Sequence, residues 1–285
     1  MNEAATGVAM AVDPLVTRIL APNSSPYTHT GTQSYLVGTT DLAVIDPGPD
    51  DPAHVQALLD AIAGRPVVAI LCTHTHRDHS PAAASLKTAT GAPVIGCAPL
   101  TMDDAGPRAD AAFDTAYAPE RILRDGESVT GTGWTLEAIA TPGHTSNHLA
   151  FALPEAQALF SGDHVMGWST TVVAPPDGDM GAYMASLEKL MARNDRIYFP
   201  GHGDAVENPQ RFVRGLLGHR KQREGQILRL LRQDVHRVDA MVARMYVGLD
   251  PRLTGAAARS VLAHLLDLQS RGSVEEEAGQ WKIAA

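Results

Sequence analysis

The stretch Thr73-His74-Thr75-His76-Arg77-Asp78-His79 decides how this sequence is interpreted. It directly follows the apolar run Val67–Cys72, whose length and composition are typical of a buried strand. Residues two apart project to the same side of an extended chain, so His74 and His76 can bind one metal ion together. Asp78 and His79 lie where the chain is expected to turn into a helix, and they could serve a second ion. The stretch therefore predicts a metal site at the end of a strand.

Three more segments supply the ligands that such a site would still need. Each places a histidine or an aspartate on a glycine-containing turn after a β-rich run, as in Pro142-Gly143-His144, Ser161-Gly162-Asp163 and Pro200-Gly201-His202. Loops that follow strands gather at one edge of a sheet, so the four segments are expected to meet there. Imidazole and carboxylate ligands suit Zn²⁺, with Fe²⁺ and Mn²⁺ as the alternatives.

The order of the four segments resembles the metallo-β-lactamase superfamily, over residues from about 15 to 204. The resemblance implies an α/β protein, an αββα sandwich with the site at one edge. It also implies two divalent metal ions and assigns the ligands to them. The first ion would be bound by His74, His76 and His144. The second would be bound by Asp78, His79 and His202, with Asp163 bridging both.

A carboxylate at the position of Asp163 resembles glyoxalase II and the ribonuclease Z group, whereas true metallo-β-lactamases lack it. β-Lactamase activity is therefore less expected. Two ions about 3.5–4 Å apart can share a hydroxide, and lowering the pKa of that water toward about 7 makes it a nucleophile at neutral pH. The prediction is an enzyme, a dinuclear metallo-hydrolase whose metal-bridging hydroxide attacks a small ester-like, thioester or lactone substrate. A mononuclear iron sulfur dioxygenase would use fewer ligands than this chain offers.

Further polar residues beside these segments are candidates for supporting or catalytic roles. Asp78 is assigned to catalysis as well as to the second metal. Asp46 matches a superfamily aspartate near the site, which suggests that it orients a ligand imidazole by hydrogen bonding; the alternative is a turn-forming aspartate before Pro47. His164 is expected to point away from the site or to act as a proton donor. His148 is expected to support the site without binding metal.

Expected strands and helices alternate over residues 1–208, and we predict that these residues form a metal-binding catalytic domain. A helix is expected between Asp51, as its N-cap, and Gly64, just past its end. A second helix is expected over 182–191. The short runs with β-rich composition cover residues 33–38, 42–46, 67–71, 135–140, 149–153, 158–161 and 197–199.

The sequence predicts a second, helical domain over residues 209–285. One long amphipathic helix from about 209 to 231, bent near Gly215 or Gly218, is followed by helices over 238–247 and 256–270 and by a terminal hairpin. Three helices and a hairpin are the order of a winged-helix module. The stretch 219–228 and this module resemble the β-lactamase-like protein 2 subfamily. Many members of it have two glycines after the metal-binding motif, where this chain has Ser80-Pro81-Ala82-Ala83.

The charge of the chain changes sign between these parts. The net charge is −9, but residues 1–204 hold 10 Lys and Arg against 23 Asp and Glu, and residues 205–285 hold 13 against 9. A small-molecule substrate is the first expectation. The basic helix residues Arg211, Arg214, Arg220, Lys221 and Arg223 could instead track a phosphate backbone. The alternatives are an endoribonuclease or phosphodiesterase acting on single-stranded RNA, and a nucleic-acid-binding regulator with an idle metal site.

Composition also suggests where the protein works. Two cysteines, Cys72 and Cys97, cannot form a disulfide scaffold and suit a reducing compartment. The first 16 residues contain no basic segment followed by an apolar run, and no stretch is long and apolar enough for a membrane span. A cytoplasmic protein without a membrane partner is expected, and the helical domain could support a homodimer.

Overall fold

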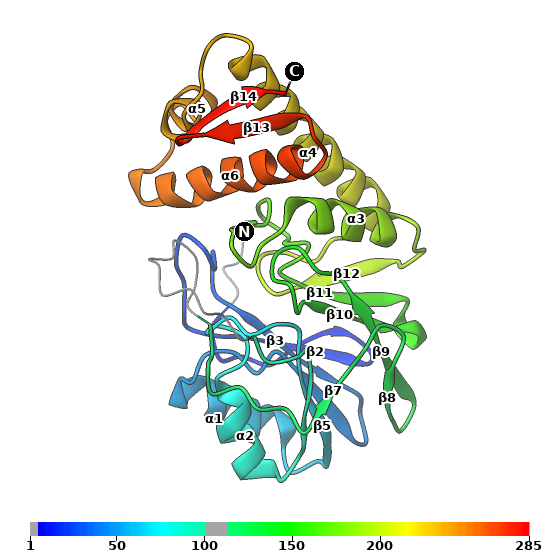
Figure 1. Cartoon of the computed structure of the whole chain (residues 1–285). Coiled ribbons are helices and arrows are strands. Elements are labelled where there is room, and N and C mark those ends of the chain that lie inside the picture. The colour runs from blue at the N-terminus through cyan, green and yellow to red at the C-terminus, as the bar shows by residue number, and fades with distance from the viewer. Residues whose placement is uncertain (1–4, 101–112, 285) are drawn as a thin grey trace.

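Two β-sheets pack face to face, with helices on both outer sides, in the computed structural model (Figure 1). The structure describes residues 5–100 and 113–284. This arrangement confirms the predicted αββα sandwich. The sheets form most of the lower body of the molecule in Figure 1, and the helical C-terminal part lies above them.

The first sheet has seven strands that lie in the order of the chain. The pairs among the first four strands are antiparallel, and the pairs from the fourth strand to the seventh are parallel. The strands are β1 (Met10–Asp13), β2 (Val16–Leu20), β3 (Gln33–Val37), β4 (Leu42–Ile45), β5 (Val67–Cys72), β6 (Val94–Gly96) and β7 (Arg121–Ile122). Helices α1 (Pro52–Ile62) and α2 (Ala82–Thr90) connect the parallel strands, and both contribute side chains to the core beside this sheet.

The second sheet has five strands in the order β12-β11-β10-β9-β8. They are β8 (Ser128–Gly131), β9 (Trp134–Ala140), β10 (Leu149–Leu153), β11 (Ala158–Gly162) and β12 (Ile197–Pro200). Alternation along β10 shows how this sheet is buried on both faces. Phe151 belongs to the core between the sheets, whereas Ala150 and Ala152 belong to the core under α3 (Met180–Met191) and α4 (Pro209–Leu231).

Helix α4 contributes to two separate cores. Val213, Leu216 and Leu217 pack with α3 on the second sheet, whereas Ile227 and Leu231 belong to the core of the C-terminal helices. The helix runs without interruption through the two glycines at which the sequence predicts a bend. The domain boundary predicted between residues 208 and 209 lies just before α4. This helix both covers the sandwich and begins the C-terminal part of the chain.

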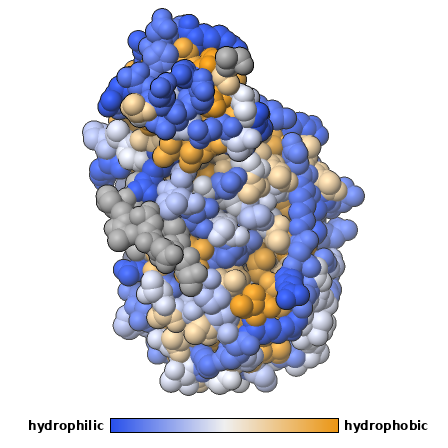
Figure 2. Space-filling view, viewed as in Figure 1, coloured by the Kyte–Doolittle hydropathy of each residue, from blue (hydrophilic) through white to orange (hydrophobic). Residues whose placement is uncertain are grey.

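The C-terminal part has the predicted order of helices followed by a hairpin. Its elements are α5 (Val238–Met245), α6 (Thr254–Ser270), β13 (Val274–Glu277) and β14 (Gln280–Ile283). On the face shown in Figure 2 this part is mostly hydrophilic, with hydrophobic side chains where it meets the sandwich. None of the helices in the described part of the chain combines the length and apolar character needed to cross a lipid bilayer.

The strand directions explain where the site forms. Strands β4 and β5 run parallel, so the segments after Ile45 and Cys72 leave the first sheet at the same edge. In the second sheet β11 and β12 are parallel and β9 has the same direction, because β10 runs antiparallel to both β9 and β11. The polar segments that follow these five strands therefore converge at one edge of the sandwich.

Candidate metal centre

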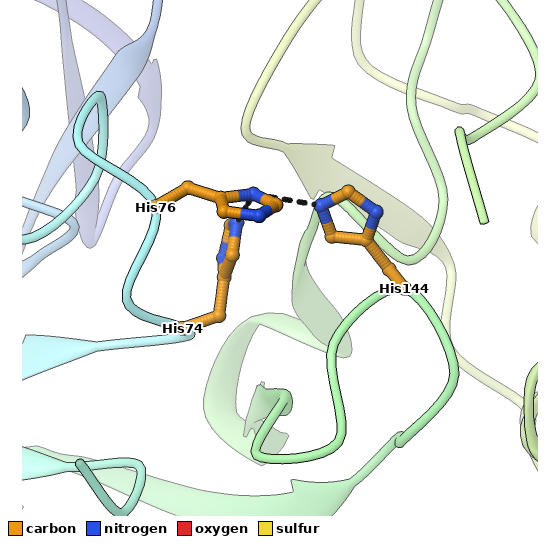
Figure 3. A group of neighbouring side chains, drawn as sticks. All are labelled: His74, His76 and His144. Atoms are coloured by element: carbon orange, nitrogen blue, oxygen red, sulfur yellow. Dashed lines mark hydrogen bonds between the residues drawn. The ribbon is translucent and has the colours of Figure 1, made fainter. Parts of the chain in front are cut away.

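Three imidazoles from two loops converge to form the first candidate metal group (Figure 3). His74 and His76 leave the end of β5, and His144 lies on the turn after β9. Nδ1 of His76 lies 3.0 Å from Nε2 of His74 and 3.1 Å from Nε2 of His144. All three side chains are buried. Three imidazole nitrogens that face one another in this way could hold one metal ion.

A second group combines two imidazoles with a carboxylate. Oδ2 of Asp78 lies 3.1 Å from Nε2 of His202 and 3.4 Å from Nε2 of His79. The two histidines are buried and Asp78 is partly buried. The turn after β5 thus places His74 and His76 in the first group and Asp78 and His79 in the second, as the spacing predicts. The oxygen and two nitrogens could hold another ion.

The carboxylate of Asp163 lies between the two groups. Its Oδ2 is 3.7 Å from Nε2 of His144 in the first group and 3.4 Å from Nε2 of His202 in the second. Its Oδ1 is 3.4 Å from Nε2 of His79. All seven residues that the resemblance assigned to metal binding are therefore brought together at this edge of the sandwich.

Neighbouring carbonyl and hydroxyl groups hold the imidazole rings by the nitrogen that faces away from the centre. Nδ1 of His144 donates to the carbonyl oxygen of Val172 at 2.7 Å, and Nδ1 of His202 to that of Gly31 at 3.1 Å. Nδ1 of His74 lies 2.9 Å from Oγ1 of Thr73. Such contacts fix each ring and its tautomer, which leaves Nε2 of each ring free to bind a cation.

Asp46 has no direct place in either group but supports both. Its Oδ2 accepts hydrogen bonds from Nδ1 of His79 at 2.9 Å and from Oγ1 of Thr73 at 2.8 Å, and its Oδ1 accepts one from the Thr73 amide. The residue has a positive φ of 47° and is buried. This geometry suits the orienting role expected of Asp46, and it includes the turn conformation offered as the alternative.

His148 holds the backbone that carries the central carboxylate. Its Nε2 accepts a hydrogen bond from the amide of Asp163 at 3.2 Å, and its Nδ1 lies 2.8 Å from Oγ1 of Thr141. The ring is buried and belongs to neither candidate group. His148 is thus a positioning residue in this structure, in agreement with the supporting role expected for it.

Two glycines make room for these side chains. A Cβ atom on Gly201 would lie 2.6 Å from Oδ1 of Asp163 and 2.7 Å from Cε1 of His79. A Cβ on Gly162, whose φ is 49°, would lie 2.7 Å from Nε2 of His148. Gly201 therefore permits the close approach of the chain to the carboxylate, and Gly162 permits its approach to His148.

The electrostatics of the two groups differ. Burial lowers the pKa of His74 well below its usual value and that of His76 to about 3, so both rings are neutral at neutral pH. Burial acts the same way on His79 and His202, but the surrounding carboxylates outweigh it. They raise the pKa of His79 well above its usual value and that of His202 to about 10. The second group therefore holds protons that a divalent cation would displace.

Two buried polar atoms of the candidate metal centre also lack a hydrogen bond. Nε2 of His79 and Oδ1 of Asp163 are buried, and neither has a hydrogen-bond partner in the described part of the chain. Buried polar atoms are nearly always paired, so a buried nitrogen and oxygen that face each other without a bond indicate a missing partner. A hard or borderline divalent cation fits this combination of imidazole and carboxylate donors.

His164 occupies a different environment from its neighbour Asp163. Its ring packs on Tyr183 with centroids 4.6 Å apart and is fully buried. Neither ring nitrogen has a hydrogen-bond partner in the described structure, and burial lowers the pKa of His164 to about 3. A ring that is neutral at neutral pH and lies outside both candidate groups does not favour the proton-donor role and agrees with a side chain that points elsewhere.

Comparison with known proteins identifies the family. Residues 27–202 match the Metallo-beta-lactamase superfamily, and residues 238–281 match the Beta-lactamase associated winged helix domain. The chain belongs to the metallo-β-lactamase superfamily and carries a C-terminal winged-helix domain. It is a metallo-hydrolase. Both the recognition of the superfamily and the winged-helix prediction are therefore confirmed.

Individual relatives add detail. The chain is 33% identical to the beta-lactamase-like protein 2 homolog of Drosophila melanogaster, covering 93% of this chain and 94% of the relative. It is 31% identical to the atrochrysone carboxyl ACP thioesterase of Aspergillus fumigatus, over 79% of this chain and 67% of the relative.

Solved structures share the fold. A metallo-β-lactamase family protein from Thermus thermophilus has a TM-score of 0.76 at 22% identity, covering 96% of this chain and all of the other. A chain crystallised in a di-iron-bound form has a TM-score of 0.52 at 30% identity, covering 68% of this chain and 94% of the other.

Proposed function

We propose that the protein is a dinuclear hydrolase of small thioester or lactone substrates. The observation that carries the dinuclear part is the position of Asp163, whose carboxylate lies within 3.7 Å of ligand nitrogens in both candidate groups. A carboxylate shared between two cation sites keeps the ions close enough to act on one substrate.

The chemistry divides between the metal ions and the chain. Two divalent ions bound there would lower the pKa of water and polarise the oxygen of the scissile group. The chain holds the ligands: His74, His76 and His144 would bind one ion, Asp78, His79 and His202 the other, and Asp163 both. Asp46 and His148 fix the orientation of His79 and of the Asp163 backbone. Asp78, whose Oδ2 lies 3.1 Å from Nε2 of His202, would also take part in catalysis.

Zinc is the proposed metal, and iron or manganese are the alternatives. Five imidazoles and two carboxylates suit all three ions, because borderline nitrogen and oxygen donors do not separate them strongly. The di-iron form of a chain with the same fold supports keeping iron among the candidates.

A thioester is the favoured substrate class. The fungal relative that bears the name thioesterase supports this assignment. The acidic charge of residues 1–204, with 10 basic against 23 acidic side chains, disfavours a polyanionic substrate over the sandwich. One of the five basic residues considered for RNA binding, Arg220, is buried, so the set does not form one exposed strip.

Metal analysis and a substrate panel test the proposal. After chelation and reloading with zinc, iron or manganese, the wild-type chain is expected to hold about two ions, and His74→Ala and His202→Ala to hold fewer. His236→Ala, in the C-terminal part, serves as the matched control and should retain both ions. One ion or fewer in the wild-type chain would contradict a dinuclear site.

The panel comprises an acyl thioester, a lactone, a chromogenic cephalosporin, bis-p-nitrophenyl phosphate and single-stranded RNA. Chelator-sensitive turnover of the thioester or lactone, with little dependence on salt, supports the proposal. Preferential cleavage of RNA would contradict it. The RNA arm should use exposed-charge variants such as Arg214→Glu and not a truncation at residue 208, because removing α4 would uncover the second sheet.

A further inference from the structure

A pocket of about 230 Å³ lies between the catalytic sandwich and the C-terminal helices. One wall is the segment from Met166 to Val172 that follows β11, and the opposite wall comes from α4, α6 and the segment between α5 and α6. Figure 1 shows α4 and α6 side by side above the sandwich. Complete small-molecule sites usually enclose about 300–1,000 Å³, so this pocket is sized for part of a substrate.

The charge of the pocket is opposite to that of the protein. Its lining includes Arg220 and Arg223 and, among the residues that the structure describes, contains no aspartate or glutamate, although the chain carries a net charge of −9. Its hydroxyl-bearing residues include Ser169, Thr170 and the buried Ser260. These groups can donate hydrogen bonds, so the lining is suited to an anion.

Arg220 is a buried cation with no counter-ion among the described residues. Only 2% of it is exposed, and its Nη2 donates to the carbonyl oxygen of Thr171 while its guanidinium lies 5.0 Å from the centre of the Tyr183 ring. Its Nε has no hydrogen-bond partner, and no carboxylate of the described residues lies within 4.0 Å of it. A guanidinium stays charged when buried, and a buried charge is costly unless it is paired.

Arg223 adds a second cation one helical turn further along α4. Its guanidinium lies 4.5 Å from the centre of the Tyr246 ring and donates to Gln226 and to the carbonyl oxygen of Met245. These partners are neutral, so its charge is also uncompensated within the described structure. Residues three apart on a helix share a face, which places both cations toward the same space.

The pocket shares a wall with the candidate metal centre. Thr171 lines the pocket, and its Oγ1 donates to the carbonyl oxygen of Asp163 at 2.7 Å. Val172 also lines it, and its carbonyl oxygen accepts from Nδ1 of His144. The pocket therefore lies directly beside the candidate metal centre, separated from it by the segment that carries Thr171 and Val172.

We propose that this pocket is an anion subsite, in which Arg220 and Arg223 bind a phosphate or carboxylate on the thiol portion of a thioester substrate. The inference rests on the thioesterase function proposed above. Thiol carriers with such groups include phosphopantetheine and glutathione. The enclosed volume favours one anionic group of a small molecule over a nucleic-acid strand, which needs an extended basic groove.

The first test compares three thioesters with the same acyl group, hydrolysed by the metal-loaded full chain. S-acetyl phosphopantetheine and S-acetyl glutathione carry anions, and S-acetyl pantetheine is neutral. We expect kcat/KM to be at least about 10-fold higher for one of the anionic thioesters, as one charged hydrogen bond provides. The ratio of anionic to neutral kcat/KM should fall toward 1 in Arg223→Gln. Lys221→Gln removes a neighbouring charge that lies outside the pocket and should keep the wild-type ratio.

The second test measures binding of the free thiols phosphopantetheine, glutathione and pantetheine by calorimetry, so it does not depend on turnover. Arg220→Gln is included here with its metal content measured, because this residue contacts the wall of the centre. Tighter binding of an anionic thiol that is lost in both arginine variants supports the subsite. Equal binding of anionic and neutral thiols by the wild-type chain would overturn it, even where thioesters are hydrolysed.

The outcomes separate this inference from the proposed function. Arginine-dependent binding of an anionic thiol without hydrolysis of any thioester would refute the thioesterase proposal and retain an anion-binding pocket. Arginine-dependent binding of a single-stranded RNA oligomer, with no preference among the thiols, would overturn the small-molecule assignment.

Discussion

Nδ1 of His79 donates a hydrogen bond of 2.9 Å to Oδ2 of Asp46, and both side chains are buried. A carboxylate can only accept, so this contact fixes the proton on Nδ1 and turns Nε2 toward Asp78 and Asp163. The second candidate group thus depends on a residue that would not itself touch the metal.

Replacing this acceptor tests the dependence. Asp46→Asn keeps the shape but can present an N–H to His79, so we expect the affinity for the second metal ion to fall about 10- to 100-fold. Titration of metal-free protein with zinc, followed by metal analysis, measures the effect. Asp50→Asn, at an exposed carboxylate, is the control. Equal affinities in Asp46→Asn and the wild type would show that the hydrogen bond does not orient His79.

His148 should act through Asp163. In His148→Leu the buried amide of Asp163 loses its acceptor, at a cost of about 1–3 kcal/mol, and the carboxylate is no longer held in register. We expect kcat to fall about 10-fold and zinc affinity to fall with it. His148→Gln offers an acceptor and a donor again and should recover part of both. Equal losses in the two variants would argue that only the volume of the ring matters.

Gly201 should resist even the smallest enlargement. The Cβ of Gly201→Ala would approach Oδ1 of Asp163 to 2.6 Å, so the carboxylate must move and metal affinity should fall at least about 10-fold. Gly215→Ala, in α4, meets no atom within 4 Å and should leave metal affinity unchanged while stabilising the helix by about 0.5–1 kcal/mol. Wild-type zinc affinity in Gly201→Ala would contradict the close approach.

His264 should make stability depend on pH. This buried residue of α6 has its pKa lowered to about 3, first by burial and then by Arg220 and His219. Because the folded pKa lies below the unfolded value near 6.5, stability is complete above that pH and decreases as pH falls toward 3. Between pH 6.5 and 4.5 the loss from this group is about 2 kcal/mol.

Urea unfolding at several pH values measures this loss. His264→Leu cannot take up a proton, so its stability should decrease less steeply than that of the wild-type chain over the same range. Any loss of metal at low pH affects both proteins alike, so the difference between their curves isolates His264. Parallel curves for the two proteins would refute the assignment.

The site could be predicted from sequence because its residues carry their own signals. In the 73–79 stretch, two pairs of ligand residues follow the end of one strand and project toward two candidate groups. The turns after β9, β11 and β12 each carry a histidine or an aspartate. The acceptors of His144 and His202 could not be found this way. They are backbone carbonyl groups, of Val172 and Gly31, and any residue type supplies a carbonyl.

Other differences have local causes. Strands β6 and β7 have only three and two residues, too few for an alternation pattern to appear. Composition groups Arg220 with the surface charges, yet it lies three, four and seven residues after Leu217, Leu216 and Val213. That spacing puts Arg220 on the buried face of α4, so its burial could be predicted from helical periodicity but not from its charge.

The two roles of α4 also bear on the order in which the protein can form during synthesis. The last candidate ligand, His202, leaves the ribosome before the helix that covers the second sheet, since Val213, Leu216 and Leu217 come later in the chain. Until they emerge, the nascent sheet presents an uncovered apolar face, a state that favours aggregation or chaperone capture. We therefore expect a translational pause just after residue 202 to lower the yield of native enzyme more than a pause beyond residue 231.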